Sequence, residues 1–285
     1  MRKERNLWHK LSLCLLSVCL LCGSCGDDTS PEDDGTLLPE GEYPVTFTSN
    51  IFAFTASDPS LDGSAVWNTG DEIAVQIGSD VKRYTVESDG KTLSSSEPFY
   101  WTSSEETKRV TAWFPYSAAQ PEELMVESDQ SSEENFRRSD YLVTGTGVSA
   151  VFGSNNTLSF SHRMAKVRIN LLPSDNVPDI DGATVRLVNL TGVHGGNSVI
   201  PHVSDAAARA YTACLVPQDV SRQRFVQVDL SGETYYYLPA EDEGSLVAGK
   251  YYVYNVSVTK DGLLGKLEQS GAWEGTDQEV STVSN

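Results

Sequence analysis

The sequence predicts an all-β protein, and three observations lead to that prediction. Apolar and polar side chains alternate along many short segments, which is the period of a strand with one buried face. Clusters of Gly, Asn, Asp and Ser separate these segments as turns do. Helical periodicity is scarce, and His202 to Ala210 is the best short candidate for a helix. Many strands with regular turns favour β-sandwiches.

Residues 1–24 are expected to be a lipoprotein signal peptide that lies outside the fold. Four basic residues precede an apolar run from Leu11 to Leu21, which is shorter than the roughly 20 residues that span a bilayer. The run ends in Leu21-Cys22-Gly23-Ser24-Cys25, and small residues just before a cysteine resemble the bacterial lipobox. This resemblance implies cleavage before Cys25 and lipidation of Cys25. An ordinary secretory signal cut nearby is the alternative.

Residues 25–42 are expected to form an acidic tether. Seven acidic residues lie between Gly26 and Glu42, with Gly and Pro and little to bury, and such a segment stays disordered. Acidic residues directly after the lipidated cysteine resemble the surface-export signal of Bacteroidetes lipoproteins, whereas a plain solvated linker is the alternative. The expected location is therefore the cell outer membrane, lipid-anchored and exposed at the surface.

The segments with a period of two follow one another from residue 43 onward, and each is expected to place its apolar side chains on one sheet face. These side chains are Tyr43, Val45 and Phe47; Ile73, Val75 and Ile77; Val110, Ala112 and Phe114; Val167, Ile169 and Leu171; Val226, Val228 and Leu230; and Tyr252, Tyr254, Val256 and Val258. Turn clusters between them include Ser88-Asp89-Gly90, Gly153 to Asn156, Asp181-Gly182, Gly195-Gly196-Asn197 and Ser231-Gly232.

One stretch indicates a change of sheet. Apolar residues have even numbers from Leu158 to Met164 and odd numbers from Val167 to Leu171. A strand face with a period of two cannot switch in this way without an extra residue, so we expect a bulge or a new sheet near Ala165-Lys166. With the loop-rich stretch from Phe136 to Asn156 before it, this predicts an N-terminal β-sandwich at 43–157 and a C-terminal one at 158–285.

The charge excludes one class of partner. The chain has 21 basic and 40 acidic residues, of which four basic residues and one acidic residue lie in the first 25 positions. The rest of the chain therefore has 17 basic and 39 acidic residues, a net charge of −22. Such a surface repels nucleic acid, so no nucleic-acid partner is expected. It also repels anionic lipid headgroups, so the lipid must provide the anchor. Solubility alone is the other explanation of the acidity.

No catalytic, cofactor or metal site is expected. Cys214 is the one cysteine after Cys25 and sits in a predicted strand, where a small buried hydrophobe is the expected role. His162 lies on an apolar strand face and is expected to be packed and hydrogen-bonded. Asp179-Ile180-Asp181-Gly182 hints at a calcium loop but lacks the distal glutamate, which favours a turn. The sequence also lacks the nucleophile-elbow, P-loop and dinucleotide motifs.

Three aromatic clusters have two interpretations, since aromatic faces can stack on sugars or fill a core. Core packing is the favoured one, because strands carry aromatics on both faces. The clusters are Phe99-Tyr100-Trp101, Trp113-Phe114-Pro115-Tyr116 and Tyr235-Tyr236-Tyr237.

A set of motifs along the mature chain resembles the fimbrillin-like proteins of Bacteroidales, the subunits and anchors of lipoprotein-derived pili. The motifs are Trp67 to Ile73, Trp113 to Tyr116, Ser139 to Leu142, Leu158 to Val167, Leu215 to Gln218, Gly249 to Tyr254 and Trp273. The resemblance implies two transthyretin-like Greek-key β-sandwich domains and no enzymatic activity. It also implies assembly with other pilus subunits by strand complementation, in which an extended segment of one subunit fills a groove in the next.

The distribution of basic residues favours one role within that family. The resemblance implies that polymerising subunits lose an N-terminal strand by cleavage after a basic residue, which exposes a sheet edge. Here the first basic residue after Cys25 is Lys82, beyond several predicted strands. The C-terminal tail from Glu274 to Asn285 carries only two apolar residues and is a poor donor strand. The expected role is an anchor or accessory subunit that supports adhesion.

Two other functions remain open from the sequence. A surface glycan-binding lipoprotein of a polysaccharide-uptake system is the main alternative, and an enzyme is the remote one. A binding platform needs several exposed, coplanar aromatic rings, whereas a fimbrillin buries them. The host or glycan ligand, if there is one, cannot be identified from the sequence.

Overall fold

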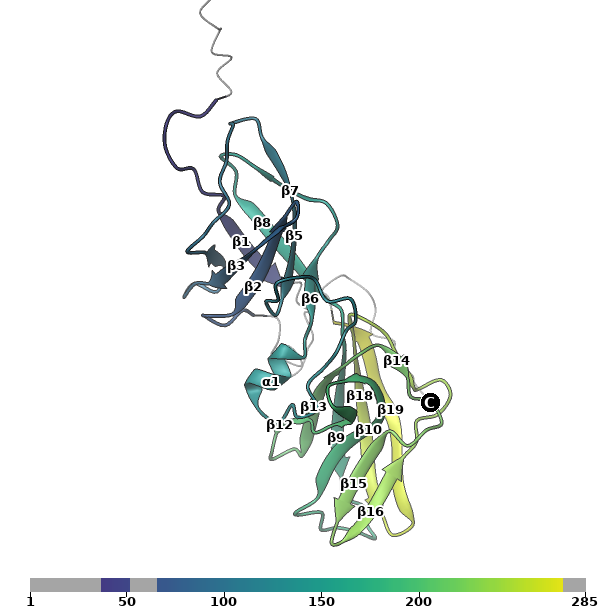
Figure 1. Ribbon diagram of the computed structural model, residues 1–285. Coiled ribbons are helices and arrows are strands. Elements are labelled where there is room, and N and C mark those ends of the chain that lie inside the picture. The colour runs from purple at the N-terminus through teal and green to yellow at the C-terminus, as the bar shows by residue number, and fades with distance from the viewer. Residues whose placement is uncertain (1–36, 52–65, 274–285) are drawn as a thin grey trace, which may run out of the picture. The chain divides into compact units, whose positions relative to one another are not determined.

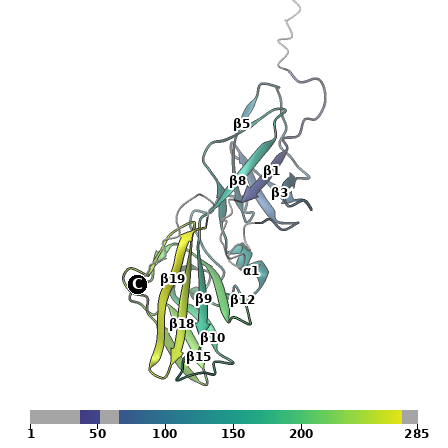
Figure 2. The ribbon, with the colours of Figure 1, turned by 180° about the vertical axis from the view of Figure 1, so that it is seen from behind.

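The computed structural model describes residues 37–51 and 66–273, and these residues form the all-β fold that the alternating pattern predicts. Figure 1 and Figure 2 show the strands from opposite sides. The described residues contain one α-helix, α1 (Glu133–Arg138). The predicted signal peptide, Cys25, most of the predicted tether and the tail after Trp273 lie outside the described residues.

The first sheet closes on itself. Its strands are hydrogen-bonded in the order β2-β3-β4-β1-β8-β6-β5-β7, and a further pairing of β2 with β5 completes a ring. Its strands are β1 (Phe47–Ile51), β2 (Glu72–Ile77), β3 (Asp80–Val86), β4 (Thr92–Ser94), β5 (Thr107–Phe114), β6 (Leu142–Thr144), β7 (Val148–Val151) and β8 (Asn156–His162).

The remaining strands form two larger sheets and one short pair. One sheet has the order β11-β10-β15-β16, the other β12-β13-β9-β18-β19, and β14 pairs with β17. The strands are β9 (Ala165–Leu172), β10 (Thr184–Val193), β11 (Gly196–Val199), β12 (His202–Asp205), β13 (Ala210–Leu215), β14 (Gln218–Asp219), β15 (Val226–Leu230), β16 (Glu233–Tyr237), β17 (Ser245–Leu246), β18 (Lys250–Thr259) and β19 (Gly262–Ala272).

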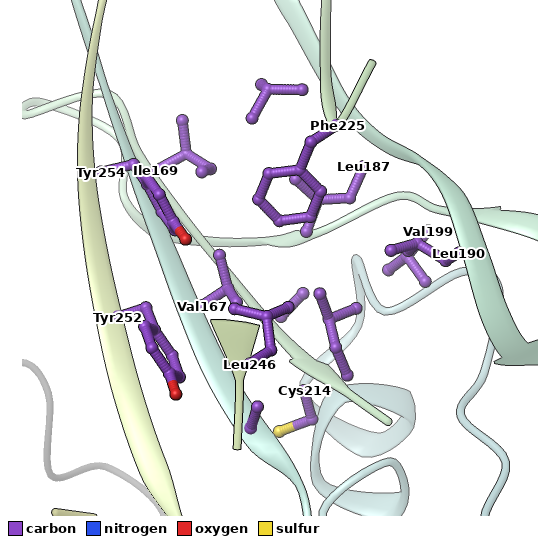
Figure 3. Packing of buried hydrophobic residues seen from close by; sticks show 14 of the residues in the cluster. Val167, Ile169, Leu187, Leu190, Val199, Cys214, Phe225, Leu246, Tyr252 and Tyr254 are labelled. Carbon is purple, nitrogen blue, oxygen red and sulfur yellow. The ribbon is translucent and has the colours of Figure 1, made fainter. Parts of the chain in front are cut away.

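Most of the predicted strand faces are buried, although Tyr43 and Ile77 are only half-buried and Tyr43 and Val45 precede β1. Val167 and Ile169 on β9 lie beside Tyr252 and Tyr254 on β18, and all four are at most 5% exposed. They pack against side chains of the facing layer, among them Phe225, which directly precedes β15 and lies between these two layers (Figure 3). Burial of this apolar surface is the main favourable contribution to the stability of the fold.

The expected change of sheet near Ala165-Lys166 is found. Strand β8 ends at His162 in the first sheet, and β9 begins at Ala165 in the five-stranded sheet. The predicted domain boundary between residues 157 and 158 falls inside β8, which pairs in parallel with β1 from Asn156 to Phe160. The division into two domains stays a prediction, and this pairing favours a division after His162.

Two local predictions were wrong. The segment His202 to Ala210 is not a helix: β12 and the start of β13 pair in a hairpin, with Val203 opposite Tyr211. Conversely, the stretch Phe136 to Asn156, taken as loop-rich, contains the end of α1 and strands β6 and β7. Ser132 caps this helix by accepting a hydrogen bond from the Asn135 amide at 3.2 Å.

The connection between β5 and β6 links the first sheet to the later strands. Val126 and Asp129 form parallel bridges with Val193 and Ile200. Val126, Phe136 and Tyr141 share one hydrophobic cluster with residues of the two later sheets. This connection therefore extends the core of the later sheets with side chains from the first half of the chain.

Candidate functional site

Three sequence motifs meet around the indole ring of Trp67. This ring contacts Phe114 and Phe160 edge to face, with centroid distances of 5.4 and 5.1 Å. All three side chains are at most 6% exposed. The tryptophan follows β1 in the chain, whereas its partners lie on β5 and β8, so the contact joins strands that are far apart in sequence.

The same motif holds a nearly buried ion pair. Asp71 accepts a hydrogen bond from the Asn68 amide at 2.8 Å and pairs with the Arg137 guanidinium of α1. The two side chains are 13% and 10% exposed, so water screens the pair weakly. The ion pair therefore ties the turn before β2 to the helix in the β5–β6 connection.

A second polar cluster lies where β8 ends. Nδ1 of His162 is 2.9 Å from Oδ1 of Asp140, and both side chains are at most 4% exposed. The imidazole stacks on the Trp273 indole, over which the Lys166 ammonium also lies at 5.1 Å. The prediction that His162 is packed and hydrogen-bonded is confirmed.

Cys214 lies in the same region as a buried side chain. Its backbone exchanges two hydrogen bonds with the Gln130 side chain, at 2.9 and 2.8 Å. Burial raises the pKa of the thiol well above its ordinary value, and Asp140 raises it further. The thiol is fully buried and stays protonated, so it serves as the small hydrophobe that the sequence predicts.

The described residues offer no group of three or more His, Cys, Asp or Glu side chains that could hold a metal ion. The Asp179 to Gly182 stretch forms a turn, in which Asp179 accepts a hydrogen bond from the Asp181 amide at 2.9 Å. Asp181 also pairs with Arg209. The turn interpretation is therefore confirmed.

The aromatic clusters are mostly core. Phe99, Trp101, Trp113, Phe114 and Tyr237 are buried, Tyr116, Tyr235 and Tyr236 are half-buried, and Tyr100 is 41% exposed. The rings of Tyr116 and Tyr236 are in addition covered by Arg83 and Arg224. These clusters therefore lack the several exposed, coplanar rings that a glycan platform needs.

Strand β1 occupies an interior position of the first sheet. It is hydrogen-bonded to β4 on one side and to β8 on the other, and Phe47 and Ile51 point into the core. Figure 1 and Figure 2 both show it beside β8. Removal of this strand alone would open a groove between β4 and β8.

The first basic residue after Cys25 is itself held in a strand. Lys82 lies opposite Val75 in the β2–β3 ladder. Its ammonium donates a hydrogen bond to the Pro98 carbonyl at 2.8 Å and lies 4.6 Å from the centre of the Phe99 ring. The peptide bond after this residue is therefore part of the folded sheet.

Cys25, the predicted lipidation site, lies outside the described residues. None of the helices described here is long and apolar enough to cross a membrane. The sequence analysis missed the Asp71–Arg137 ion pair and the His162–Trp273 stack. The partners are 66 positions apart in the first pair and 111 in the second, so no local pattern indicated that they are in contact.

Comparison with known proteins gives a family and a fold. Residues 51–272 match the family model described as fimbrillin-like. A candidate cell adhesion protein of known structure from Bacteroides ovatus has a TM-score of 0.63 and 19% identity, and the match covers 83% of this chain and 100% of that one. A similar candidate from Bacteroides uniformis gives 0.60 and 16%, with the same coverage.

A fimbrial protein from Bacteroides ovatus is a third match, with a TM-score of 0.51 and 14% identity over 78% of this chain and 50% of that one. No curated protein matches the chain. At these identities the solved structures establish a shared fold, while the family model covers most of the sequence.

Proposed function

The chain belongs to the fimbrillin-like family, and we propose that it is a non-enzymatic surface lipoprotein that supports adhesion as an anchor or accessory subunit of a Bacteroidales-type pilus. In this proposal Cys25 carries the lipid and holds the protein in the outer membrane. Other pilus subunits are its partners and join it by strand complementation.

The observation that carries this role is the absence of Lys and Arg from Gly26 to Val81. A protease specific for basic residues has no site between the lipidated cysteine and β2. It therefore cannot remove β1 alone, which is the step that would open the groove between β4 and β8. A subunit that keeps β1 also keeps its N-terminal lipid and stays at the cell.

Cleavage at Lys82 would not give the same result. It would separate β1, β2 and part of β3 from the rest of the chain, and Ile73 and Val75 of β2 are fully buried. The exposed apolar surface would be far larger than one groove. A domain with marginal stability would not survive this loss.

The charge of the mature chain supports a lipid anchor. A net charge of −22 gives the protein no electrostatic attraction to an anionic leaflet. One acyl chain gives only marginal membrane binding, whereas the two or more chains of a bacterial lipoprotein give a stable anchor. Membrane retention should therefore depend on Cys25.

We also retain two transthyretin-like Greek-key domains as a proposal. Two packed sheets formed from β9 to β19 support a sandwich in the second half. In the first half, the strands from β1 to β8 form a sheet that the pairing of β2 with β5 closes, which supports a barrel-like variant of the sandwich.

The experiment is the N-terminal sequence and intact mass of the protein recovered from cells and from sheared surface material. The proposal expects a lipidated N-terminus at Cys25 and protein that remains with the cells. The Cys25→Ala variant should leave the membrane fraction and lose label from a palmitate analogue. Protein found chiefly in sheared filaments, beginning between residues 48 and 70, would identify a polymerising subunit instead.

A further inference from the structure

A hollow of about 380 Å³ opens at one end of the first sheet. Strands β1, β5 and β8 begin at this end, and β7 ends there. The hollow is lined by the segment before β1, by Trp101 and by the turn from β7 to β8. Its volume is within the range of small-molecule sites, about 300–1,000 Å³, and the mouths of closed sheets are a common place for such sites.

The backbone around the hollow is held in place by hydrogen bonds within the protein. The side chain of Asn156, which is 9% exposed, accepts a hydrogen bond from the Val151 amide at 2.9 Å and donates one to the Thr46 carbonyl at 3.3 Å. The Trp101 amide donates a further hydrogen bond to the Tyr43 carbonyl at 2.8 Å. The walls are therefore fixed before a ligand arrives, which lowers the ordering cost of binding.

Three aromatic rings form the apolar part of the lining. Phe152 contacts Tyr43 and Trp101 edge to face, with centroid distances of 6.1 and 6.0 Å. Trp101 is buried, whereas Tyr43 and Phe152 are half-buried and line the hollow with the accessible part of their rings. Such rings offer an apolar surface on which the C–H face of a sugar can pack.

Exposed side chains form the polar part of the lining. Thr46 and Ser154 offer hydroxyl groups, which both donate and accept hydrogen bonds, and Glu42 offers a carboxylate, which accepts them. The hydroxyl groups of a sugar are also donors and acceptors. The lining therefore matches a ligand that has hydroxyl groups at its edges and an apolar face.

The charges around the hollow favour a ligand without charge. The Glu42 carboxylate in the lining repels an anion. The Lys108 ammonium lies 5.5 Å from the centre of the Trp101 ring and is paired with Glu106. A second cation on this ring would therefore meet a like charge.

We propose that this hollow binds one neutral hexose unit of a glycan. The C–H face of the sugar packs on Tyr43 and Phe152, and its hydroxyl groups bond to Thr46, Ser154 and Glu42. A single unit in a hollow needs fewer aromatic rings than an extended platform does. The inference deepens the proposed role in adhesion and rests on it for the exposure of the site at the cell surface. The test uses purified protein, so a failure of sugar binding is distinguishable from a failure of lipid anchoring.

The test titrates the methyl glycosides of glucose, galactose, mannose and N-acetylglucosamine into the folded protein. NMR follows the signals of Tyr43, Trp101 and Phe152, and at least one glycoside should shift all three. Thr46→Val and Ser154→Ala should each weaken the binding of that glycoside about five-fold, the worth of one net hydrogen bond. Phe152→Leu keeps an apolar side chain without the ring and should abolish binding.

The charge preference is tested with a matched probe. The glycoside that binds is compared with its uronic acid, which has the same ring and a carboxylate at C6. The uronic acid should bind more weakly, and Glu42→Gln should reduce the difference between the two probes.

Thr184→Val is the control variant, because it removes an exposed hydroxyl from β10, far along the chain from the hollow, and should leave binding unchanged. Thermal unfolding establishes that each variant is folded. Absence of shifts at the three rings with all four glycosides would overturn the proposal. Equal binding of the glycoside to Thr46→Val, to Ser154→Ala and to the unchanged protein would overturn it as well.

Discussion

The imidazole ring of His162 lies flat on the indole ring of Trp273, with centroids 3.7 Å apart and planes 9° apart. The histidine ends β8 in the first sheet, and the tryptophan directly follows β19 in the five-stranded sheet. Asp140 contacts the same imidazole at 2.9 Å. One buried stack thus connects the final strand of the described fold to the first sheet.

Loss of the Trp273 side chain should be strongly destabilising. The residue is 2% exposed, and truncation of a buried aromatic side chain costs about 3–5 kcal/mol. Trp273→Ala should therefore lower the midpoint of urea unfolding markedly, whereas Trp273→Phe keeps a ring against His162 and should cost less. Equal midpoints for Trp273→Ala and the unchanged protein would show that the stack adds nothing to stability.

Removal of His162 tests the other half of the same cluster. His162→Ala leaves the buried Asp140 carboxylate without its imidazole hydrogen-bond partner, and an unsatisfied buried group costs about 1–3 kcal/mol, or more when it is charged. His194→Ala is the control, because that histidine is exposed. Circular dichroism during urea unfolding gives both free energies, and similar values for the two variants would contradict a structural role for the pair.

The pH dependence of stability should contain a contribution from Asp89. Hydrogen bonds from the Thr92 hydroxyl and from the Thr92 and Lys91 amides lower its pKa from 3.8 to about 2. Because the pKa is lower in the folded state, this contribution is present above pH 3.8 and is lost as the pH falls toward about 2. Asp89→Asn should reduce the acid sensitivity of the unfolding midpoint in this window.

Thr92→Val provides the matched variant for that measurement, because it removes the hydroxyl that contributes most to the lowered pKa. It should reduce the same pH dependence in part. An identical acid profile for the unchanged protein and both variants would mean that this turn does not contribute.

The strand pattern made much of this fold predictable. Val167, Ile169 and Leu171 were expected on one face and are at most 1% exposed. The parity change near Ala165 located the change of sheet, because a period of two is a local property of the chain. Pairing between distant strands has no such local signal, and the parallel partnership of β1 with β8 could not be predicted from it.

The candidate site was predictable only in part. Ser132-Glu133-Glu134, followed by Arg137-Arg138, is a helix signal that was present but not used. The expectation for His202 to Ala210 failed because its alanines lie in a tight turn between two paired strands. The contacts of Trp67 with Phe114 and Phe160 depend on tertiary packing, which no spacing in the sequence encodes.

Val256→Asp should destabilise the five-stranded sheet. Val256 is fully buried on β18 between Leu171 of β9 and Gly265 of β19. A buried carboxylate without a partner should cost about 3–5 kcal/mol. Ser257→Asp, one residue along and half-buried, is the control and should cost much less. A melting temperature unchanged by Val256→Asp would show that the inward face is assigned incorrectly.

The last prediction concerns resistance to proteases that cleave after basic residues. Lys82 is paired within the β2–β3 ladder, and its ammonium is bound to the Pro98 carbonyl. A protease needs an extended, accessible segment, so the folded protein should not be cut there. Limited digestion followed by intact-mass measurement should therefore leave β1 and β2 covalently joined to the chain after Lys82. Thr69→Arg is the control, because it places a basic residue at an exposed position between those strands. That variant should be cut after residue 69, which separates β1 from β2 and makes release of β1 possible. Rapid cleavage of the unchanged protein after Lys82 would remove the argument that the protein keeps its first strand.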